Sequence, residues 1–202
     1  MIDIIKYGEF KPVGKQKKKH QIILTHTSRN INDYLQSLKF RFNGSFKRIP
    51  NYIITREGKI LQLLGNEEHS EYFKEPNINR NSIIVSLENL GWLQKEPLTD
   101  HYINWIGDIY KGNVFEKKWR DYFFWQPYTE TQIYNLGLLC KELFESVKIK
   151  SQIVEHNTKI IGIEKYCGVV TKSNFSIDYT DVSPAFEFNE LLKNIENEQF
   201  TR

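Results

Sequence analysis

The feature that most constrains the fold is the run Gln21-Ile22-Ile23-Leu24-Thr25-His26-Thr27, which is apolar in its middle and polar at its carboxyl end. A short aliphatic run of this kind is typical of a strand that is buried on both faces. Ligands of open sheets bind beyond the carboxyl ends of the strands. We therefore expect a buried strand over residues 21–27, with His26 at the edge where a site would lie.

Segments with helical and with strand periodicity alternate along the rest of the chain. Asn30 or Asn32 can cap the first helix, and Thr129-Glu130-Thr131-Gln132 is a capping-box signature for the second. The predicted helices cover residues 31–42, 129–143 and 188 to about 198, and the other predicted strands cover residues 52–55, 60–64, 82–89 and 152–155. The order β-α-β-β-β-α-β-α predicts an α/β fold, a single domain over residues 1–202 with a central mixed β-sheet flanked by helices.

The stretch from residue 92 to residue 128 interrupts this order, because it is crowded with aromatic residues and lacks clean periodicity. One interpretation is a satellite hydrophobic cluster that covers one end of the sheet. The other is a wall for carbohydrate or peptide, since aromatic rings offer large and rigid contact faces. We interpret the stretch as an aromatic-rich insertion in the single domain, and both roles stay open.

Charge and hydropathy exclude several classes of protein. The net charge of +3 is too mild to indicate a nucleic-acid partner. No segment reaches the roughly 18 consecutive apolar residues of a membrane span, and the first residues lack the pattern of a signal peptide. We expect a monomer that is made in the cytoplasm. The run Lys15-Gln16-Lys17-Lys18-Lys19-His20 is the one dense basic patch, either a solvated loop or a phosphate-steering segment.

Two histidines follow apolar runs that read as strands. His26 ends the first strand, and His156 ends Ile153-Val154-Glu155. Asp181 stands shortly before the apolar segment Pro184-Ala185-Phe186. Two neutral imidazoles and a carboxylate suit Zn²⁺. A histidine at a strand end is also commonly a satisfied core residue, so the residues alone leave both interpretations open.

An ordered set of motifs resembles the zinc-dependent N-acetylmuramoyl-L-alanine amidases, the group that includes amidase-type phage lysozymes and peptidoglycan recognition proteins. The similar segments are residues 22–28 (a strand with a zinc histidine), 52–60 (a hairpin), 68–70 (a cleft histidine), 81–89 (a strand with a catalytic glutamate), 153–156 (the second zinc histidine) and 181–186 (the third ligand). The resemblance spans about residues 20–195 in the order of the family.

The resemblance implies that His26, His156 and Asp181 bind a Zn²⁺ cofactor, with water in the fourth position. Such a metal lowers the pKa of its bound water to about 7. The implied reaction is hydrolysis of the amide bond between N-acetylmuramic acid and L-alanine in peptidoglycan. The implied partner is peptidoglycan or a muropeptide.

The chain departs from the family's pattern at two catalytic positions. Ser86 aligns with the frequent catalytic glutamate and cannot act as a base. Glu88, two residues further on, is the candidate general base, with a surface carboxylate as its alternative interpretation. Tyr179 stands where the family often has a basic residue, and its phenol could donate to an oxyanion. Lys172 could supply a cation there. Together with Ser86 and Lys172, His69 is predicted to contact substrate.

Two alternative assignments of the ligands remain. Thr25-His26-Thr27 also matches the Ser-His-Thr of non-catalytic recognition proteins, which would place Thr25 in the ligand position. Cys167 is an alternative third ligand. We prefer His26 and Asp181.

The alternatives extend to the function. An endolysin released by a holin, or an effector delivered by a secretion machine, is the expected setting of an amidase that acts on the cell wall without a signal peptide. A non-catalytic peptidoglycan-binding domain of the same fold is the main alternative, and a cytoplasmic amidase of recycled muropeptides is a weaker one.

Overall fold

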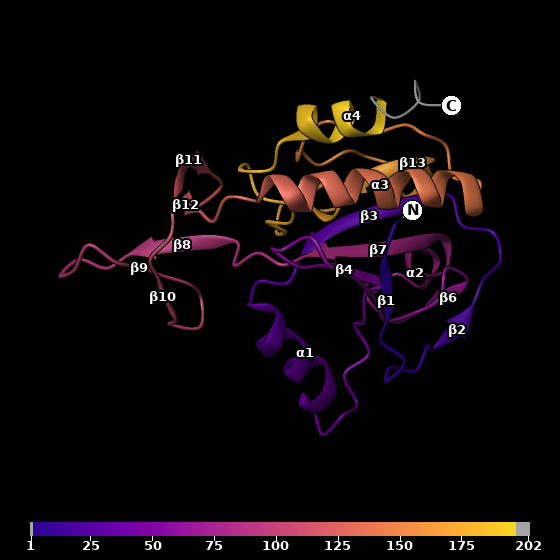
Figure 1. The fold of residues 1–202 in the computed structure, drawn as a ribbon, viewed down its shortest axis with the longest axis horizontal. Coiled ribbons are helices and arrows are strands. Elements are labelled where there is room, and N and C mark those ends of the chain that lie inside the picture. The colour runs from indigo at the N-terminus through magenta and orange to yellow at the C-terminus, as the bar shows by residue number, and fades with distance from the viewer. Residues whose placement is uncertain (1, 197–202) are drawn as a thin grey trace.

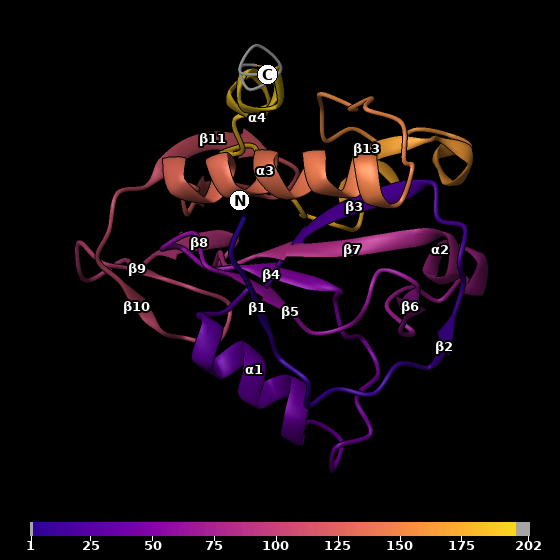
Figure 2. The same cartoon turned by 45° about the vertical axis from the view of Figure 1, so that its right-hand side comes forward.

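The computed structural model describes residues 2–196 and has a central six-stranded sheet in the order β1-β5-β4-β7-β3-β13 (Figures 1 and 2). Its strands are β1 (Ile4–Lys6), β3 (Gln21–His26), β4 (Tyr52–Ile54), β5 (Ile60–Gln62), β7 (Ser82–Leu87) and β13 (Gly168–Thr171). The α-helices are α1 (Ile31–Phe40), α2 (Pro76–Asn81), α3 (Glu130–Ser146) and α4 (Phe188–Glu196). The predicted α/β class with a mixed central sheet flanked by helices is confirmed.

The strands β4, β7, β3 and β13 run parallel, whereas β5 is antiparallel to β4. Every residue of β3 and β7 is buried. Since the two strands pair in register from Gln21–Ser82 to His26–Leu87, their carboxyl ends meet at one edge of the sheet. This pairing positions the candidate site.

Helices α3 and α4 cover one face of the sheet, and α1 lies on the opposite side (Figures 1 and 2). Successive side chains of β3 point to opposite faces of the sheet. Ile22 and Leu24 pack in the core beneath α3 and α4, and Ile23 packs on the other face. The capping box at Thr129 and Gln132 starts α3 as predicted, and Asn30 caps α1. Helix α4 agrees with the predicted last helix, whose final two residues lie outside the described part.

Residues 92–125 form a second sheet at one side of the domain, which we call the arm, in the order β10-β9-β8-β12-β11 (Figure 1). Its strands are β8 (Trp92–Lys95), β9 (Tyr102–Ile103), β10 (Ile109–Tyr110), β11 (Phe115–Trp119) and β12 (Tyr122–Trp125). Many of its aromatic rings pack on one another: Trp92 stacks on Tyr122, and Trp125 is fully buried between Trp119 and Tyr122. Trp105 and Phe123 stay exposed.

One local prediction is wrong, and another holds only in part. Residues 152–155 form no strand and contribute a single bridge, Ile153 to Val169, because β13 takes the place beside β3. The basic run 15–20 is not a uniform solvated loop. Lys15 belongs to the short strand β2 (Gly14–Lys15), which pairs with β6 (Glu68–His69), and the Lys19 ammonium is buried where it donates to the carbonyls of Glu68 and Ser82.

The core beneath α3 gives a stability prediction. Leu136→Ala removes a fully buried side chain, so we expect the free energy of unfolding to fall by about 2–5 kcal/mol. The matched control is Leu98→Ala, whose side chain is 96% exposed and whose loss should change stability by less than about 0.5 kcal/mol. Chemical denaturation of both variants measures the difference. Equal effects would contradict this placement of α3.

Candidate functional site

The candidate site lies at the carboxyl ends of β3 and β7. The pleat separates its polar residues: His26 follows the face of Ile22 and Leu24, whereas Thr25 follows the face of Ile23. Thr25 and Ser86 are register partners on neighbouring strands, and both are fully buried. The edge therefore carries an imidazole on one side and two hydroxyl groups on the other.

The carboxylate of Asp181 joins the last loop to the end of β3. Its Oδ1 accepts from the backbone N–H of His26 at 3.0 Å and lies 3.4 Å from Nε2 of the same histidine. Its Oδ2 accepts from the Lys172 ammonium at 3.2 Å. Lys172 follows β13 directly, at the start of the 3-10 turn η2 (Lys172–Asn174). The three side chains form one ion-paired group, which we call the edge triad.

Burial and charge set the protonation of the edge triad. Burial pushes the pKa of Asp181 up, but the charges of Lys172 and His26 and the hydrogen bonds from both residues outweigh it and hold the pKa below its usual value. Burial lowers the pKa of His26, with the Asp181 charge opposing and the Lys172 charge reinforcing that effect. The group is therefore a carboxylate between an ammonium and a neutral imidazole near neutral pH.

A second polar group occupies the other face of the edge. The hydroxyl of Thr25 shares a hydrogen bond of 2.9 Å with the phenol of Tyr72 and donates to Ser86 Oγ at 3.2 Å. Burial raises the pKa of Tyr72 to about 12, so its phenol stays neutral. The Lys172 ammonium sits over the ring of Tyr179, 4.5 Å from its centroid, and 5.8 Å from that of Tyr72.

The carboxylate of Glu88, the predicted general base, is held by two backbone amides. Its oxygens accept from Ile31 N–H at 2.8 Å and from Arg56 N–H at 2.9 Å, and the residue is buried. These bonds tie the first turn of α1 to the β4–β5 hairpin. The prediction that Glu88 acts as a base stays a prediction, but its carboxylate has a clear structural task.

His156, the predicted second zinc ligand, is not brought to His26 and Asp181. It is exposed, and its Nδ1 is engaged by the hydroxyl of Thr158 at 2.7 Å. The physical reason is that β13 pairs with β3, so the segment before His156 is held on the outer side of β13 by the bridge of Ile153 to Val169. Within residues 2–196, no three His, Cys, Asp or Glu side chains lie close enough to hold a metal ion. The structure therefore does not bring the three predicted ligands together, and their binding of Zn²⁺ stays a prediction.

The remaining predicted contact residues fall in different places. His69 lies on β6 and lines a separate concavity on the side of α1, so it is not part of the edge triad. Ser86 is buried with Thr25, as described above. Cys167 lies just before β13 and lines the groove described below. Lys172 and Tyr179 are the two that the structure brings to the edge triad.

The chemistry of these donors does not fit a catalytic zinc centre, which takes three protein ligands. His26 and Asp181 are two suitable donors in contact. The other carboxylate oxygen of Asp181, Oδ2, accepts from the ammonium of Lys172, whose charge repels a metal ion. The other nitrogen of His26, Nδ1, is packed against Gly91, where a Cβ would overlap the ring. Asp181 and Lys172 instead form an ion pair within the chain.

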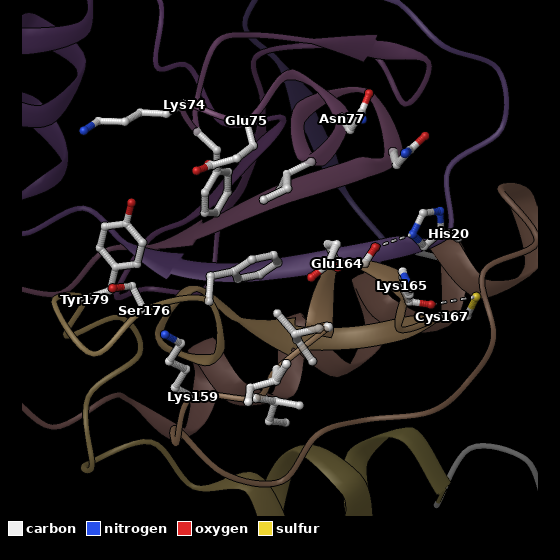
Figure 3. Close-up of a pocket in the computed structure, with 18 residues that line it drawn as sticks. His20, Lys74, Glu75, Asn77, Lys159, Glu164, Lys165, Cys167, Ser176 and Tyr179 are labelled. Atoms are coloured by element: carbon white, nitrogen blue, oxygen red, sulfur yellow. Dashed lines mark hydrogen bonds between the residues drawn. The ribbon is translucent and has the colours of Figure 1, made fainter.

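A groove of about 1130 Å³ opens beside the edge triad, between α2 and the loop from Lys159 to Cys167. Figure 3 shows Tyr179 and Lys159 at one end of this groove and His20 and Cys167 at the other. Its walls are apolar side chains such as Phe73, Ile78 and Phe175, and its rim carries Lys74, Lys159 and Lys165 beside Glu75 and Glu164. Tyr179 thus borders both the groove and the edge triad.

The arm contacts the loops on both sides of the edge. Trp105 Nε1 donates to the carbonyl of Ser28 at 2.7 Å, just after β3, and Arg29 stacks on the same ring. Arg120 donates to the carbonyl of Ser176 at 3.3 Å, and its charge acts on Asp178 and Asp181. Sequence reasoning missed Arg120 and Tyr72. The aromatic crowding of residues 92–128 was the available signal for the arm, and no pattern pointed to the arginine.

The chain belongs to the N-acetylmuramoyl-L-alanine amidase family, whose model matches residues 15–168. A comparison with curated proteins finds no significant match. The family resemblance predicted from the motifs is thus confirmed.

Solved structures of amidases share the fold. The amidase LysC from Clostridium intestinale URNW aligns with a TM-score of 0.57 at 13% identity, over 98% of this chain and 99% of LysC. AmiD from E. coli, in complex with the substrate anhydro-N-acetylmuramic acid-L-Ala-D-gamma-Glu-L-Lys, aligns with a TM-score of 0.53 at 17% identity, over 92% of this chain. AmpDH3 from Pseudomonas aeruginosa, in complex with anhydromuramic pentapeptide, aligns with a TM-score of 0.53 at 14% identity, over 96% of this chain. The chain spans 60% of the length of AmiD and 66% of that of AmpDH3.

The edge triad gives a stability prediction with a pH dependence. Lys172→Met removes the cationic partner of the buried Asp181 carboxylate, so we expect a loss of about 3 kcal/mol of unfolding free energy near neutral pH. The folded-state pKa of Asp181 is depressed, so its contribution to stability is present above the ordinary value of 3.8 and is lost as pH falls through the folded-state pKa. The difference between wild type and variant should therefore shrink on acidification below 3.8.

Denaturation curves at several pH values measure that difference, and Lys118→Met, an exposed lysine on the arm, is the matched control. A loss for Lys172→Met that stays constant from neutral to acidic pH would contradict an ion pair with Asp181.

Proposed function

We propose that this protein binds the N-acetylmuramoyl-peptide portion of peptidoglycan, and that its edge triad is a structural ion pair rather than a zinc centre. The observation that carries the proposal is the Lys172 ammonium 3.2 Å from Oδ2 of Asp181, the carboxylate that the family resemblance assigns to a metal ion. A cation built into the chain satisfies the carboxylate that a zinc ion would otherwise bind.

The alternative assignment of the first ligand supports the same proposal. If Thr25 occupies the first ligand position, Thr25 and Ser86 stand where the resemblance expects a zinc ligand and a catalytic glutamate. The structure favours this alignment because the two hydroxyls are hydrogen-bonded to each other on one face of the edge, whereas His26 follows the other face. Hydroxyl groups bind neither the metal nor the proton of an attacking water well.

The groove supplies a place for the ligand. Its volume of about 1130 Å³ accommodates an extended oligomeric ligand rather than a single small molecule. The apolar walls suit the methyl-bearing alanine and lactyl groups of a muramoyl peptide. Lys74 and Lys159 at the rim suit the free carboxylates of a peptide stem. AmiD and AmpDH3 bind muramoyl peptides of this kind, and we carry that ligand class over to this chain.

The second candidate is zinc-dependent hydrolysis of the N-acetylmuramoyl-L-alanine amide, as in an endolysin or a delivered effector that reaches the cell wall after release. The family match favours it. It requires Lys172 to leave Asp181 and His156 to leave Thr158. Asp181 and His156 would then join His26 around one ion. Among residues 2–196 no helix is long and apolar enough to cross a membrane.

One experiment separates the two candidates. Purified protein is incubated with peptidoglycan, with and without a chelator, and both the sedimented protein and the newly exposed L-alanine amino termini are measured. We expect sedimentation that does not depend on the chelator and no release above that of a blank. Chelator-sensitive release that His156→Ala abolishes would establish the amidase instead, and absence of both binding and release would overturn the proposal.

Variants of the groove rim locate the binding. Lys74→Glu together with Lys159→Glu places two negative charges beside the peptide stem, so we expect peptidoglycan affinity to fall by about tenfold or more. The matched control reverses Lys111 and Lys118, which are exposed on the arm away from the groove. Equal losses for the two double variants would show that binding follows net charge and not the groove.

A further inference from the structure

The turn that follows α1 forms a tip of the molecule on the side away from α4 (Figures 1 and 2). Two phenylalanines are largely in water there: Phe40 is 68% exposed and Phe42 is 66% exposed. The backbone at Phe42, Asn43 and Gly44 has positive φ, which is uncommon for a bulky side chain such as that of Phe42. The chain thus holds apolar rings outward at a protruding turn.

A basic concavity of about 850 Å³ begins at the same turn. Its cationic side chains come from three segments of the chain: the turn and the residues after it, the loop before α2, and α2 itself. They are Arg41, Lys47, Arg48, Lys74 and Arg80. Glu71 is the one carboxylate in its lining, and Phe42 and Val13 are its exposed apolar residues. The surface therefore combines clustered positive charge with exposed apolar side chains. We call it the basic tip.

Most of these charges have no carboxylate partner within the described residues. Lys47 pairs with Glu71 at 3.4 Å. Arg41 stacks on the rings of Phe42 and Phe46, at 5.1 and 5.0 Å from their centroids. Arg48, Lys74 and Arg80 make no ion pair in residues 2–196. In a chain with a net charge of only +3, this local concentration of positive charge favours an anionic partner.

We propose that the basic tip docks on the surface of a bilayer that contains anionic phospholipids. The cations would meet the lipid phosphates, and the rings of Phe40 and Phe42 would enter the boundary between headgroups and acyl chains. A soluble polyanion would use the cations alone and leave both rings in water. The exposed rings therefore favour the bilayer over a free phosphate polymer. This inference does not rest on peptidoglycan binding.

Flotation with lipid vesicles tests the inference. One set of vesicles is phosphatidylcholine alone, and the other contains phosphatidylglycerol as well. We expect wild-type protein to float with the anionic vesicles and not with the neutral ones. Phe40→Ser with Phe42→Ser should lower the bound fraction by about tenfold, because an interfacial helix tip loses its apolar anchor. Arg48→Gln with Arg80→Gln should do the same through the phosphates.

Matched controls are Leu98→Ser with Ile109→Ser, two apolar residues of the arm that are 96% and 61% exposed, and Lys111→Gln with Lys118→Gln. These controls should bind as wild type does, and circular dichroism verifies that all variants fold. Equal binding to neutral vesicles, or none to anionic ones, would overturn the proposal. Loss of binding in the arginine variant with full binding in the phenylalanine variant would also overturn it, because the rings would then have no role at the bilayer.

Discussion

The carboxylate of Asp181 is the group on which the arrangement of the site depends. It accepts the backbone N–H at the end of β3, contacts the imidazole of the same residue and pairs with the ammonium that follows β13. A buried carboxylate without such partners would be strongly destabilising. Its partners come from the ends of the neighbouring strands β3 and β13, whereas Asp181 itself lies in the last loop. The edge triad therefore fixes the loop from Lys172 to Asp181 against the sheet. The position of Tyr179, and with it one end of the groove, follows from that loop.

The edge of the sheet gathers polar side chains, as the sequence predicts, and under our proposal these residues hold a ligand without hydrolysing it. Parallel pairing of β3 with β7 and β13 still gathers polar side chains at the carboxyl ends of the strands. What gathers there is a pair of hydroxyls, a neutral imidazole and a carboxylate with its own cation. Such a site can orient a ligand through hydrogen bonds and an aromatic surface. Trp105 and Arg120 of the arm lie at the border of this site, and the groove extends from the site away from the edge triad.

The strands and helices with strong periodicity could be predicted from the sequence. The buried run 21–26, the helix after Asn30 and the capping box at Thr129 all depend on local patterns, and each element lies where its pattern indicates. The placement of His156 could not be obtained in this way. Both 152–155 and 168–171 are short apolar segments, and only tertiary pairing decides which of them joins β3. The pleat of β3 sets the faces of Thr25 and His26, and the choice of ligand between them stays a prediction. The contact of Arg120 with Ser176 joins residues distant in sequence, so no local pattern announces it.

The central claim is that the positive charge beside Asp181 belongs to Lys172 and not to a bound metal ion. The most direct test is the zinc content of the purified protein after equilibration with zinc and extensive dialysis, measured by inductively coupled plasma mass spectrometry. We expect no retained zinc, and the same result for His156→Ala. One zinc ion per chain in the wild type, lost in both His156→Ala and Asp181→Asn, would contradict the account.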